Sequence, residues 1–292
     1  MSERVAFLGL GKMGAPMSRR LVEAGVRLAG FDPEPSARRA LEEAGGETAE
    51  TAAGAITGAT VIVLMLPSSA VVEAVLGDEA VRAVLAPGSI VVDMSSSDPV
   101  STRALAKKLA AGKVALVDAP VSGGVVRAKD GTLTIMTGGD PADLERVAPV
   151  LAAFGTARRA GDVGAGHALK AINNLLSAVH LLATAEGVEA GRRFGLDPEV
   201  MVSLINTSSG RSGSSENKFP NYVFPGTYDS GFTVGLMLKD IRIAASLAEE
   251  VGAPVTLGGK AVELWAQAEA ALGGQADHTE IARWVQAKKD LR

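Results

Sequence analysis

Residues Val5–Gly14 read Val-Ala-Phe-Leu-Gly-Leu-Gly-Lys-Met-Gly, an apolar run followed by glycines in the spacing G-x-G-x-x-G. An amphipathic segment begins near Met13, so the stretch predicts a strand, a tight turn and the start of a helix. Gly9 permits the turn, Gly11 lets a pyrophosphate approach the backbone, and Gly14 allows close packing of helix on strand. Unpaired amides at the helix N-terminus would bind the phosphate. The pattern favours a dinucleotide site, and an ordinary strand-to-helix turn is the alternative.

A second apolar stretch, Leu28–Phe31, ends in Asp32, 18 positions after Gly14. An acidic residue at this distance typically binds the ribose of a dinucleotide. A carboxylate there hydrogen-bonds the ribose hydroxyls and repels a 2′-phosphate, so the sequence predicts NAD in preference to NADP. Asp32 also precedes a proline and suits a turn, and both roles are compatible. Arg38 and Arg39 offer charge to a 2′-phosphate, which leaves NADP as the less favoured cofactor.

The composition is that of an ordinary globular protein. Its 292 residues suggest about two domains, and 47% hydrophobic with 21% charged residues excludes disordered and fibrous classes. A net charge of -4 gives no electrostatic reason to expect nucleic acid or a membrane surface as partner. The chain has no cysteine, which excludes disulfides and thiolate chemistry. The start Met-Ser-Glu-Arg shows no secretory leader, so a cytoplasmic location is expected.

Short apolar runs alternate with helical patterns as far as about residue 160. Such alternation predicts a parallel-rich sheet covered by helices. The expected strands beyond the first two are Val61–Met65, Ile90–Val92, Val114–Val117 and Leu133–Met136. We therefore predict an α/β protein in which an N-terminal Rossmann dinucleotide-binding domain, residues 1–162, is joined by a long helix to an all-α domain, residues 163–292.

The second half opens with a proline-free stretch from His167 to about Phe194 that is apolar on most faces. This stretch predicts one long, largely buried helix, and its polar residues exclude a membrane span. Breaks are expected at 195–198, 207–215 and 220–231. The Ser/Gly-rich segment 207–215 is interpreted as a loop that lines a site, with a plain solvent loop as the alternative for most of its residues.

The segment after the fifth expected strand offers a hydroxyl beside two glycine amides. Asp118–Gly124 reads Asp-Ala-Pro-Val-Ser-Gly-Gly, and Ser122, Gly123 and Gly124 form a compact place to bind a carboxylate through backbone amides. A tight turn is the alternative, since Ser-Gly-Gly is common in turns.

The long helix carries polar residues at helical spacing. Lys170 and Asn174 are four residues apart and share one face, which Ser177 continues. One interpretation is a lysine that reaches water from the helix edge. The other is a buried ammonium that exchanges a proton with an alcohol near neutral pH, while Asn174 orients the same oxygen. Lys239-Asp240 is by default a surface pair of little energetic consequence.

Two classes of chemistry have no support in the sequence. The histidines His167, His180 and His278 lack metal-ligand spacing, so no metal is expected and each is interpreted as structural or solvent-facing. A G-x-S-x-G motif is absent, which argues against a serine hydrolase.

Four segments taken together resemble the 3-hydroxyisobutyrate dehydrogenase family of β-hydroxyacid dehydrogenases. They occur in order over essentially the whole chain: Phe7–Gly14, Asp118–Gly124, Gly164–Asn174 and Lys239-Asp240. The resemblance implies that Lys170 is the catalytic acid/base. It implies substrate binding by Ser122, Gly123, Gly124, Asn174 and Asp240. It implies cofactor binding by Gly9, Leu10, Gly11, Lys12, Met13, Gly14, Asp32, Leu66, Pro67, Ser96, Phe232 and Lys239. Arg20 departs from the asparagine usual in the family.

The implied reaction is NAD-dependent interconversion of a small 3-hydroxyacid and its semialdehyde or keto acid. The substrate would be a small carboxylate, and the family implies a homodimer or homotetramer. Alternatives are a tartronate-semialdehyde, glyoxylate or threonate enzyme, or a non-catalytic NAD-binding module. Lys170 argues against the imine-reducing relatives, which usually replace it. Residues expected to face the substrate's substituent are Val121, Val125, Ser209–Ser212 and Phe232, with Arg211 a candidate for recognising a second anionic group.

Overall fold

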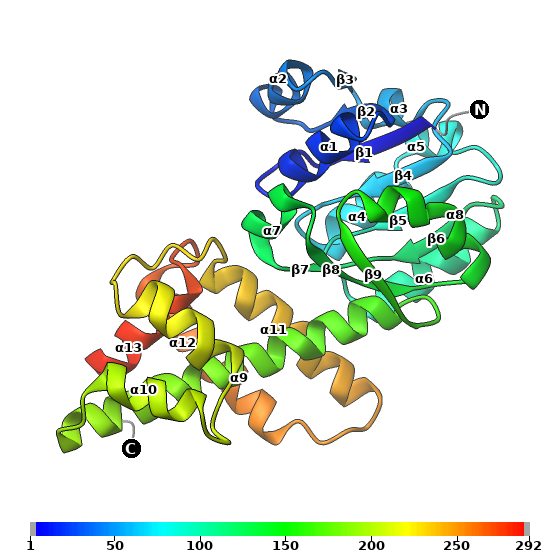
Figure 1. The fold of residues 1–292 in the computed structure, drawn as a ribbon. Coiled ribbons are helices and arrows are strands. Elements are labelled where there is room, and N and C mark those ends of the chain that lie inside the picture. The colour runs from blue at the N-terminus through cyan, green and yellow to red at the C-terminus, as the bar shows by residue number, and fades with distance from the viewer. Residues whose placement is uncertain (1–3, 289–292) are drawn as a thin grey trace. The chain divides into compact units, whose positions relative to one another are not determined.

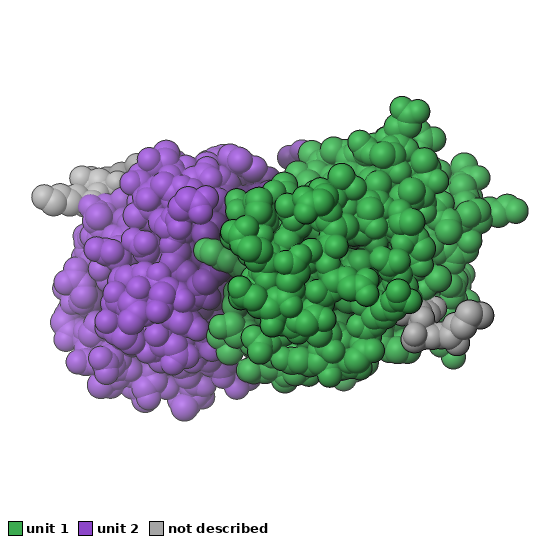
Figure 2. All heavy atoms as spheres, turned by 90° about the horizontal axis from the view of Figure 1, so that it is seen from above, with its two compact units in different colours: residues 1–170 green, residues 171–292 purple. Residues whose placement is uncertain are grey.

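The computed structural model describes residues 4–288. The chain forms two compact units, residues 1–170 and residues 171–292, which Figure 2 distinguishes by colour. Helix α9 (Ala165–Phe194) contains the division between them. The domain boundary predicted between residues 162 and 163 stays a prediction.

The first unit is built on one sheet. Its strands are β1 (Arg4–Leu8), β2 (Arg27–Phe31), β3 (Glu47–Thr48), β4 (Val61–Leu64), β5 (Ile90–Asp93), β6 (Ala115–Asp118), β7 (Val121–Ser122), β8 (Leu133–Gly138) and β9 (Gly155–Gly161). They run in the order β3-β2-β1-β4-β5-β6-β8-β7, with β9 paired to β8 (Figure 1). The first six are parallel in the Rossmann order, which confirms the predicted fold class.

Helices cover both faces of this sheet. They are α1 (Gly14–Glu23), α2 (Pro35–Glu43), α3 (Ala52–Ile56), α4 (Ser69–Gly77), α5 (Glu79–Val84), α6 (Pro99–Ala110), α7 (Gly124–Asp130) and α8 (Pro141–Ala152). Side chains alternate across the sheet: Phe7 packs in the core formed with α1, α2, α7 and α8, and Leu8 in the core formed with α3 to α6. Because both faces are buried, the central strands are continuous apolar runs in the sequence.

The parallel strands end in register at one edge of the sheet. Phe31 pairs with Leu8, Leu8 with Leu64, Leu64 with Asp93, and Asp93 with Asp118. The loops that follow these residues therefore all leave the sheet at its carboxyl edge, where open α/β sheets bind ligands.

The second unit is helical. After α9 come α10 (Pro198–Asn206), the π-helix η1 (Ser214–Val223), α11 (Val234–Glu250), α12 (Thr256–Leu272), the short 3₁₀-helix η2 (His278–Glu280) and α13 (Ile281–Ala287). Between residues 171 and 288 there is no strand, only an isolated bridge between Thr233 and Asp277. The all-α prediction for this half is thereby confirmed.

Two details differ from expectation. Burial of α9 is one-sided: Ala178, Leu181 and Ala185 are at most 5% exposed, but Ile172 and Leu176 are 45% and 52% exposed. The π-helix η1, which contains Pro220, occupies the end of one predicted break and the start of the next. In the described part of the chain, no helix has both the length and the apolarity needed to cross a membrane.

Candidate active site

The glycine turn after β1 has the geometry that its spacing predicts. Gly9 has φ +94°, and a Cβ there would lie 2.3 Å from the carbonyl oxygen of Met65. A Cβ on Gly14 would lie 1.8 Å from the carbonyl oxygen of Gly9, so the helix start is packed directly on the turn. A Cβ on Gly11 would meet no described atom within 4 Å. Gly11 thus leaves open space beside the α1 N-terminus, as a bound pyrophosphate would need.

Asp32 is bonded to this turn. Its Oδ2 accepts a hydrogen bond of 2.8 Å from the amide of Leu10, and its Oδ1 accepts one of 2.9 Å from the amide of Glu34. The guanidinium of Arg38 donates to the carbonyl oxygen of Asp32 at 2.6 Å and to Glu50 at 3.2 Å. Asp32 therefore supplies an acidic group directly after β2, and the nearby Arg38 is already hydrogen-bonded to the Asp32 carbonyl oxygen and to the Glu50 carboxylate.

The loops after β4 and β5 are tied together by Ser95. Its Oγ accepts a hydrogen bond of 2.9 Å from the amide of Leu66, and its own amide donates to Asp93 at 3.0 Å. These bonds fix the backbone around two predicted cofactor contacts, Leu66-Pro67 and Ser96. Ser96 itself is half-buried.

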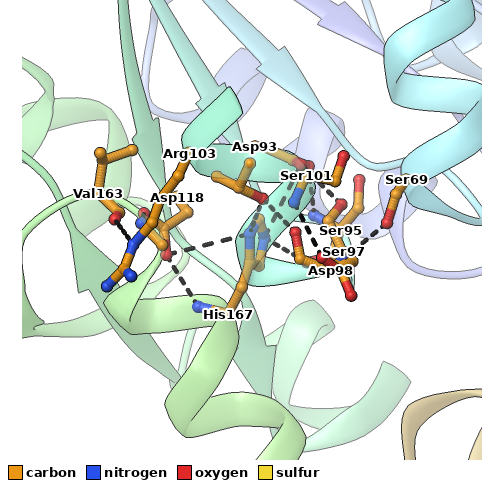
Figure 3. A network of polar contacts seen from close by, with 12 residues as sticks. Ser69, Asp93, Ser95, Ser97, Asp98, Ser101, Arg103, Asp118, Val163 and His167 are labelled. Atoms are coloured by element: carbon orange, nitrogen blue, oxygen red, sulfur yellow. Dashed lines mark hydrogen bonds and ion pairs between the residues drawn. The ribbon is translucent and has the colours of Figure 1, made fainter. Parts of the chain in front are cut away.

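A buried polar network joins these loops to the start of α9 (Figure 3). The carboxylate of Asp118 accepts hydrogen bonds from the amides of Gly164, at 2.6 Å, and His167, at 2.8 Å. The imidazole of His167 contacts the Thr102 hydroxyl at 2.9 Å and the Ser95 carbonyl oxygen at 3.1 Å. Burial raises the pKa of Asp118, while His167 and the two amides oppose the rise. The network caps the helix that carries Lys170.

The Ser-Gly-Gly segment lies at the end of β7. Ser122 pairs with Thr134 of β8 and is half-buried. Gly123 and Gly124 have φ values of +135° and +67° and are exposed at the start of α7. Only glycine adopts both conformations easily, so a substitution at either position would change the backbone at the predicted carboxylate site.

Asn174 and Asp240 meet inside the second unit. Asn174 Nδ2 donates to Asp240 Oδ2 at 2.6 Å, and Lys239 Nζ lies 3.0 Å from Asp240 Oδ1. Asn174 is 6% exposed and Asp240 is 2% exposed. The default interpretation of Lys239-Asp240 as a surface pair is therefore wrong, because the carboxylate is buried and holds the Asn174 amide. Lys170 is half-buried one turn earlier on α9.

Phe232, another predicted cofactor contact, packs against the buried side chain of His278. Its ring stands 5.6 Å from that of His278, at 83°, and its carbonyl oxygen accepts from the His278 amide at 2.8 Å. Burial lowers the pKa of His278, and the neighbouring Asp277 opposes this.

The predicted residues thus fall into two groups. In the first unit the glycine turn Gly9–Gly14, Asp32, Leu66-Pro67, Ser96 and Ser122–Gly124 follow strand ends at the carboxyl edge. In the second unit the structure brings Asn174, Lys239 and Asp240 together. The predictions gave no role to Asp118 or Ser95, although Asp118 lay in a quoted motif. Among residues 4–288 no three acidic, histidine or cysteine side chains are grouped as metal ligands.

Family models of known proteins match this chain over residues 4–285. Residues 4–164 match the family model for the NAD binding domain of 6-phosphogluconate dehydrogenase. Residues 164–285 match that for the NAD-binding domain of NADP-dependent 3-hydroxyisobutyrate dehydrogenase. The fold is that of a nicotinamide-dinucleotide-dependent dehydrogenase.

Individual relatives agree at high coverage. The chain is 35% identical to 2-(hydroxymethyl)glutarate dehydrogenase of Eubacterium barkeri, over 98% of this chain and 96% of the relative. It is 39% identical to 3-hydroxyisobutyrate dehydrogenase of Pseudomonas aeruginosa, over 91% and 93%. The solved Mycobacterium tuberculosis 3-hydroxyisobutyrate dehydrogenase with L-serine superposes with a TM-score of 0.92 at 32% identity, over 98% and 100%. The chain belongs to the 3-hydroxyisobutyrate dehydrogenase family. It is an NAD(P)-dependent dehydrogenase that acts on hydroxyl groups.

Proposed function

We propose that this enzyme oxidises a small 3-hydroxyacid to its semialdehyde, or runs the reverse reduction, with Lys170 as acid/base. The observation that carries the proposal is the Asn174–Asp240 bond of 2.6 Å, which fixes a buried amide one helical turn from Lys170. An amide held in this way can orient a substrate oxygen toward the lysine. Family membership supports the reaction class, and the relatives' different names leave the substituent open.

The residues present suit a dinucleotide. Gly11 leaves room for a pyrophosphate beside the start of α1, and Asp32 supplies a carboxylate for the ribose. When bound, the nicotinamide supplies the hydride acceptor or donor. The protein's own part is to position the groups and to hold a proton at Lys170.

On the substrate side, Ser122 and the amides of Gly123 and Gly124 are proposed to bind the carboxylate. In the oxidative direction Lys170 Nζ accepts the hydroxyl proton as the carbon hydrogen leaves as hydride, and in reduction Lys170 returns a proton to the oxygen. Asn174, held by Asp240, orients that oxygen. Each role follows from chemistry available to the side chain in its place.

Lys170→Met tests the acid/base assignment. We expect kcat for NAD reduction with 3-hydroxyisobutyrate to fall by about 10²–10⁴-fold, the usual contribution of a positioned acid/base. NAD binding, followed by protein fluorescence, should stay within about 3-fold because the lysine is proposed to act on the substrate. The matched control is Lys108→Met on the exposed side of α6, with unchanged kcat. A Lys170→Met enzyme that keeps most of its turnover would contradict the proposal.

We also propose that NAD is preferred to NADP. Asp32 would repel a 2′-phosphate, and Arg38 is held by the Asp32 carbonyl oxygen and by Glu50. The expected result is a kcat/KM at least 10-fold higher with NAD, about 1.4 kcal/mol in transition-state binding. A clear advantage for NADP would overturn the preference.

The physiological substrate is to be found by a panel monitored through NADH absorbance. The relatives are named for 3-hydroxyisobutyrate and 2-(hydroxymethyl)glutarate, and one structure was obtained with L-serine. The panel therefore includes these three compounds with threonate and tartronate semialdehyde. Turnover of none of them with either dinucleotide would contradict the proposed reaction class.

Self-association into a homodimer or homotetramer is part of the proposal. Ile172 and Leu176 on α9, and Val200 and Leu204 on α10, are between 45% and 63% exposed. Large apolar side chains in such rows are typical of surfaces covered by another subunit. Light scattering at micromolar concentration should give two or four times the mass of one chain, and a single-chain mass would contradict this.

A further inference from the structure

His167 is a buried histidine one helical turn before Lys170. It is 1% exposed and lies in the first turn of α9, three residues before the lysine. Three residues of an α-helix cover about 4.5 Å along the axis, so both belong to the same short, rigid length of backbone. A contact that fixes His167 therefore also limits where the backbone of Lys170 can lie.

The imidazole of His167 joins this turn to the loop after β5. Its Nε2 lies 3.1 Å from the carbonyl oxygen of Ser95. A carbonyl oxygen only accepts hydrogen bonds, so Nε2 carries the hydrogen and donates it. Nδ1 lies 2.9 Å from the hydroxyl of Thr102 in α6. In Figure 3 the His167 ring stands between Asp118 on one side and the loop of Ser95 and Ser97 on the other.

Ser95 connects the loops that carry two proposed cofactor contacts. Its amide donates to Asp93, its hydroxyl accepts from the amide of Leu66, and its carbonyl oxygen accepts from His167. Ser95 is 0% exposed, so water does not readily replace these partners. Leu66, bonded to Ser95, and Ser96, next to it in the chain, are the proposed contacts. His167 thus bonds the residue that holds both in place.

The backbone of the same turn is held by other parts of the sheet. The amide of His167 donates to Asp118 at the end of β6. A Cβ on Gly166 would lie 2.3 Å from the carbonyl oxygen of Met136, so the turn packs directly on β8. The backbone of His167 is therefore fixed to β6 and β8, while its side chain is fixed to the loop after β5.

The His167 ring is enclosed by polar groups. Its Nε2 lies 3.8 Å from Asp93 Oδ2, and its Nδ1 lies 4.0 Å from Asp118 Oδ2. The three side chains are at most 2% exposed. Because a buried polar group that loses its partner is costly, this arrangement of hydrogen bonds is strongly preferred over alternatives.

We propose that His167 is a positioning residue for the reaction. By bonding Ser95, it fixes the backbone of Lys170 relative to the loop that carries Ser96, so dinucleotide binding at this loop and the placement of Lys170 are coupled. This inference rests on the proposed function, which assigns Lys170 to proton transfer and Ser96 to the dinucleotide. In this role the imidazole acts through Lys170 and not on the substrate.

Two substitutions isolate the bond to Ser95. In His167→Gln the side-chain NH₂ group can take the place of the imidazole Nε2 and donate to Ser95. In His167→Asn the amide reaches only as far as Nδ1 does, and the Ser95 carbonyl oxygen loses its donor. We expect His167→Asn to lower kcat by about 10-fold or more, since a misplacement of about 1 Å in a catalytic geometry can cost about 10²-fold. His167→Gln should keep kcat within about 3-fold of wild type.

A double substitution tests whether the loss acts through Lys170. In the Lys170→Met background, His167→Asn should change kcat by less than about 2-fold, because the group that it positions is gone. A full further loss in that background would overturn the inference. The control is Ser89→Ala, which removes a buried hydroxyl bonded to the Ala86 carbonyl oxygen just before β5 begins, and kcat should be unchanged.

Hydrogen exchange gives a measurement that does not need turnover. In the wild type, saturating NADH, or NADPH if that is preferred, should slow amide exchange at 94–97 and at 166–170. In His167→Asn only the first segment should respond, and in His167→Gln both should respond. No protection of 166–170 in the wild type, or equal protection in His167→Asn, would overturn the inference.

The outcomes separate this inference from the proposed function. Oxidation of hydroxyacids at the same kcat by His167→Asn and His167→Gln would overturn the inference and leave the function intact. If no hydroxyacid is oxidised, the proposed function fails and hydrogen exchange alone decides the inference. Circular dichroism and thermal melting establish that each variant is folded. Should His167→Asn not fold, His167→Met, which also lacks a donor, takes its place in every measurement.

Discussion

The buried carboxylate of Asp118 gives the sharpest prediction about stability. It is 0% exposed and accepts hydrogen bonds of 2.6 and 2.8 Å from the amides of Gly164 and His167 at the start of α9. Asp118→Asn keeps the shape but replaces one acceptor oxygen with an NH₂ group. Whichever way the new amide turns, a donor then faces a backbone N–H donor, and one hydrogen bond is lost.

The magnitude follows from the lost hydrogen bond, and the desolvation of the buried charge opposes it. A hydrogen bond to a charged acceptor contributes roughly 1.5–3 kcal/mol, and an unpaired buried N–H costs roughly 1–3 kcal/mol. Burial raises the pKa of Asp118, which shows that desolvation of the charge offsets part of this gain. We therefore expect Asp118→Asn to lower the free energy of unfolding by about 2 kcal/mol. For a unit of this size the melting temperature should fall by about 4–8 °C.

Urea unfolding, monitored by far-UV circular dichroism, measures the decrease in the free energy of unfolding. Hydrogen exchange shows which segment is destabilised. Amides at 164–170 should exchange faster in Asp118→Asn, because both capped amides are in that segment. The control is Asp162→Asn, whose side chain is 92% exposed and pairs with Arg159, with an expected change within about 0.5 kcal/mol. An Asp118→Asn protein as stable as the control, with unchanged exchange at 164–170, would refute the capping argument.

Two further predictions concern the glycine turn and a pH-dependent ion pair. Gly14→Ala should lower both the melting temperature and the affinity for NAD, because its Cβ would lie 1.8 Å from the Gly9 carbonyl oxygen. Gly11→Ala should lower the affinity for NAD with little loss of melting temperature, because its Cβ would enter open space. Equal melting temperatures for the two variants would contradict this. Hydrogen bonds from Arg192 hold the pKa of Glu189 at about 2, below its ordinary value of 4.5. This carboxylate therefore contributes stability that is present above about pH 4.5 and lost as pH falls toward 2. Because both arginine partners are half-exposed, Glu189→Gln should cost about 1 kcal/mol at pH 7 and almost nothing at pH 2, measured by urea unfolding. If Glu189→Gln lowers the free energy of unfolding equally at both pH values, the ion pair with the arginines is not the source of the stability.

Much of the first unit could be predicted because its signals are local. The run Val5–Leu8 and the glycines that follow specify a strand, a turn and a helix through contacts between near neighbours, and the structure has all three. Strand β9 was not predicted because its residues are mostly exposed and show no alternation of apolar and polar side chains. Its sequence is Gly-Thr-Ala-Arg-Arg-Ala-Gly. The π-helix was missed because the Ser, Asn and Pro in its sequence are also typical of loops.

The sequence by itself determined the alternation of strands and helices in the first half, the place of the dinucleotide turn and the residue types available for proton transfer. Only the tertiary structure decided which of those residues act on one another. Asp118 caps a helix 46 residues further along, Asn174 is held by Asp240 across 66 residues, and Lys218 reaches Ser177 across 41. Local patterns depend on steric and solvation effects between neighbours, which the sequence displays. These pairings depend instead on how the sheet and the helices pack, so they emerge only when distant segments are brought together.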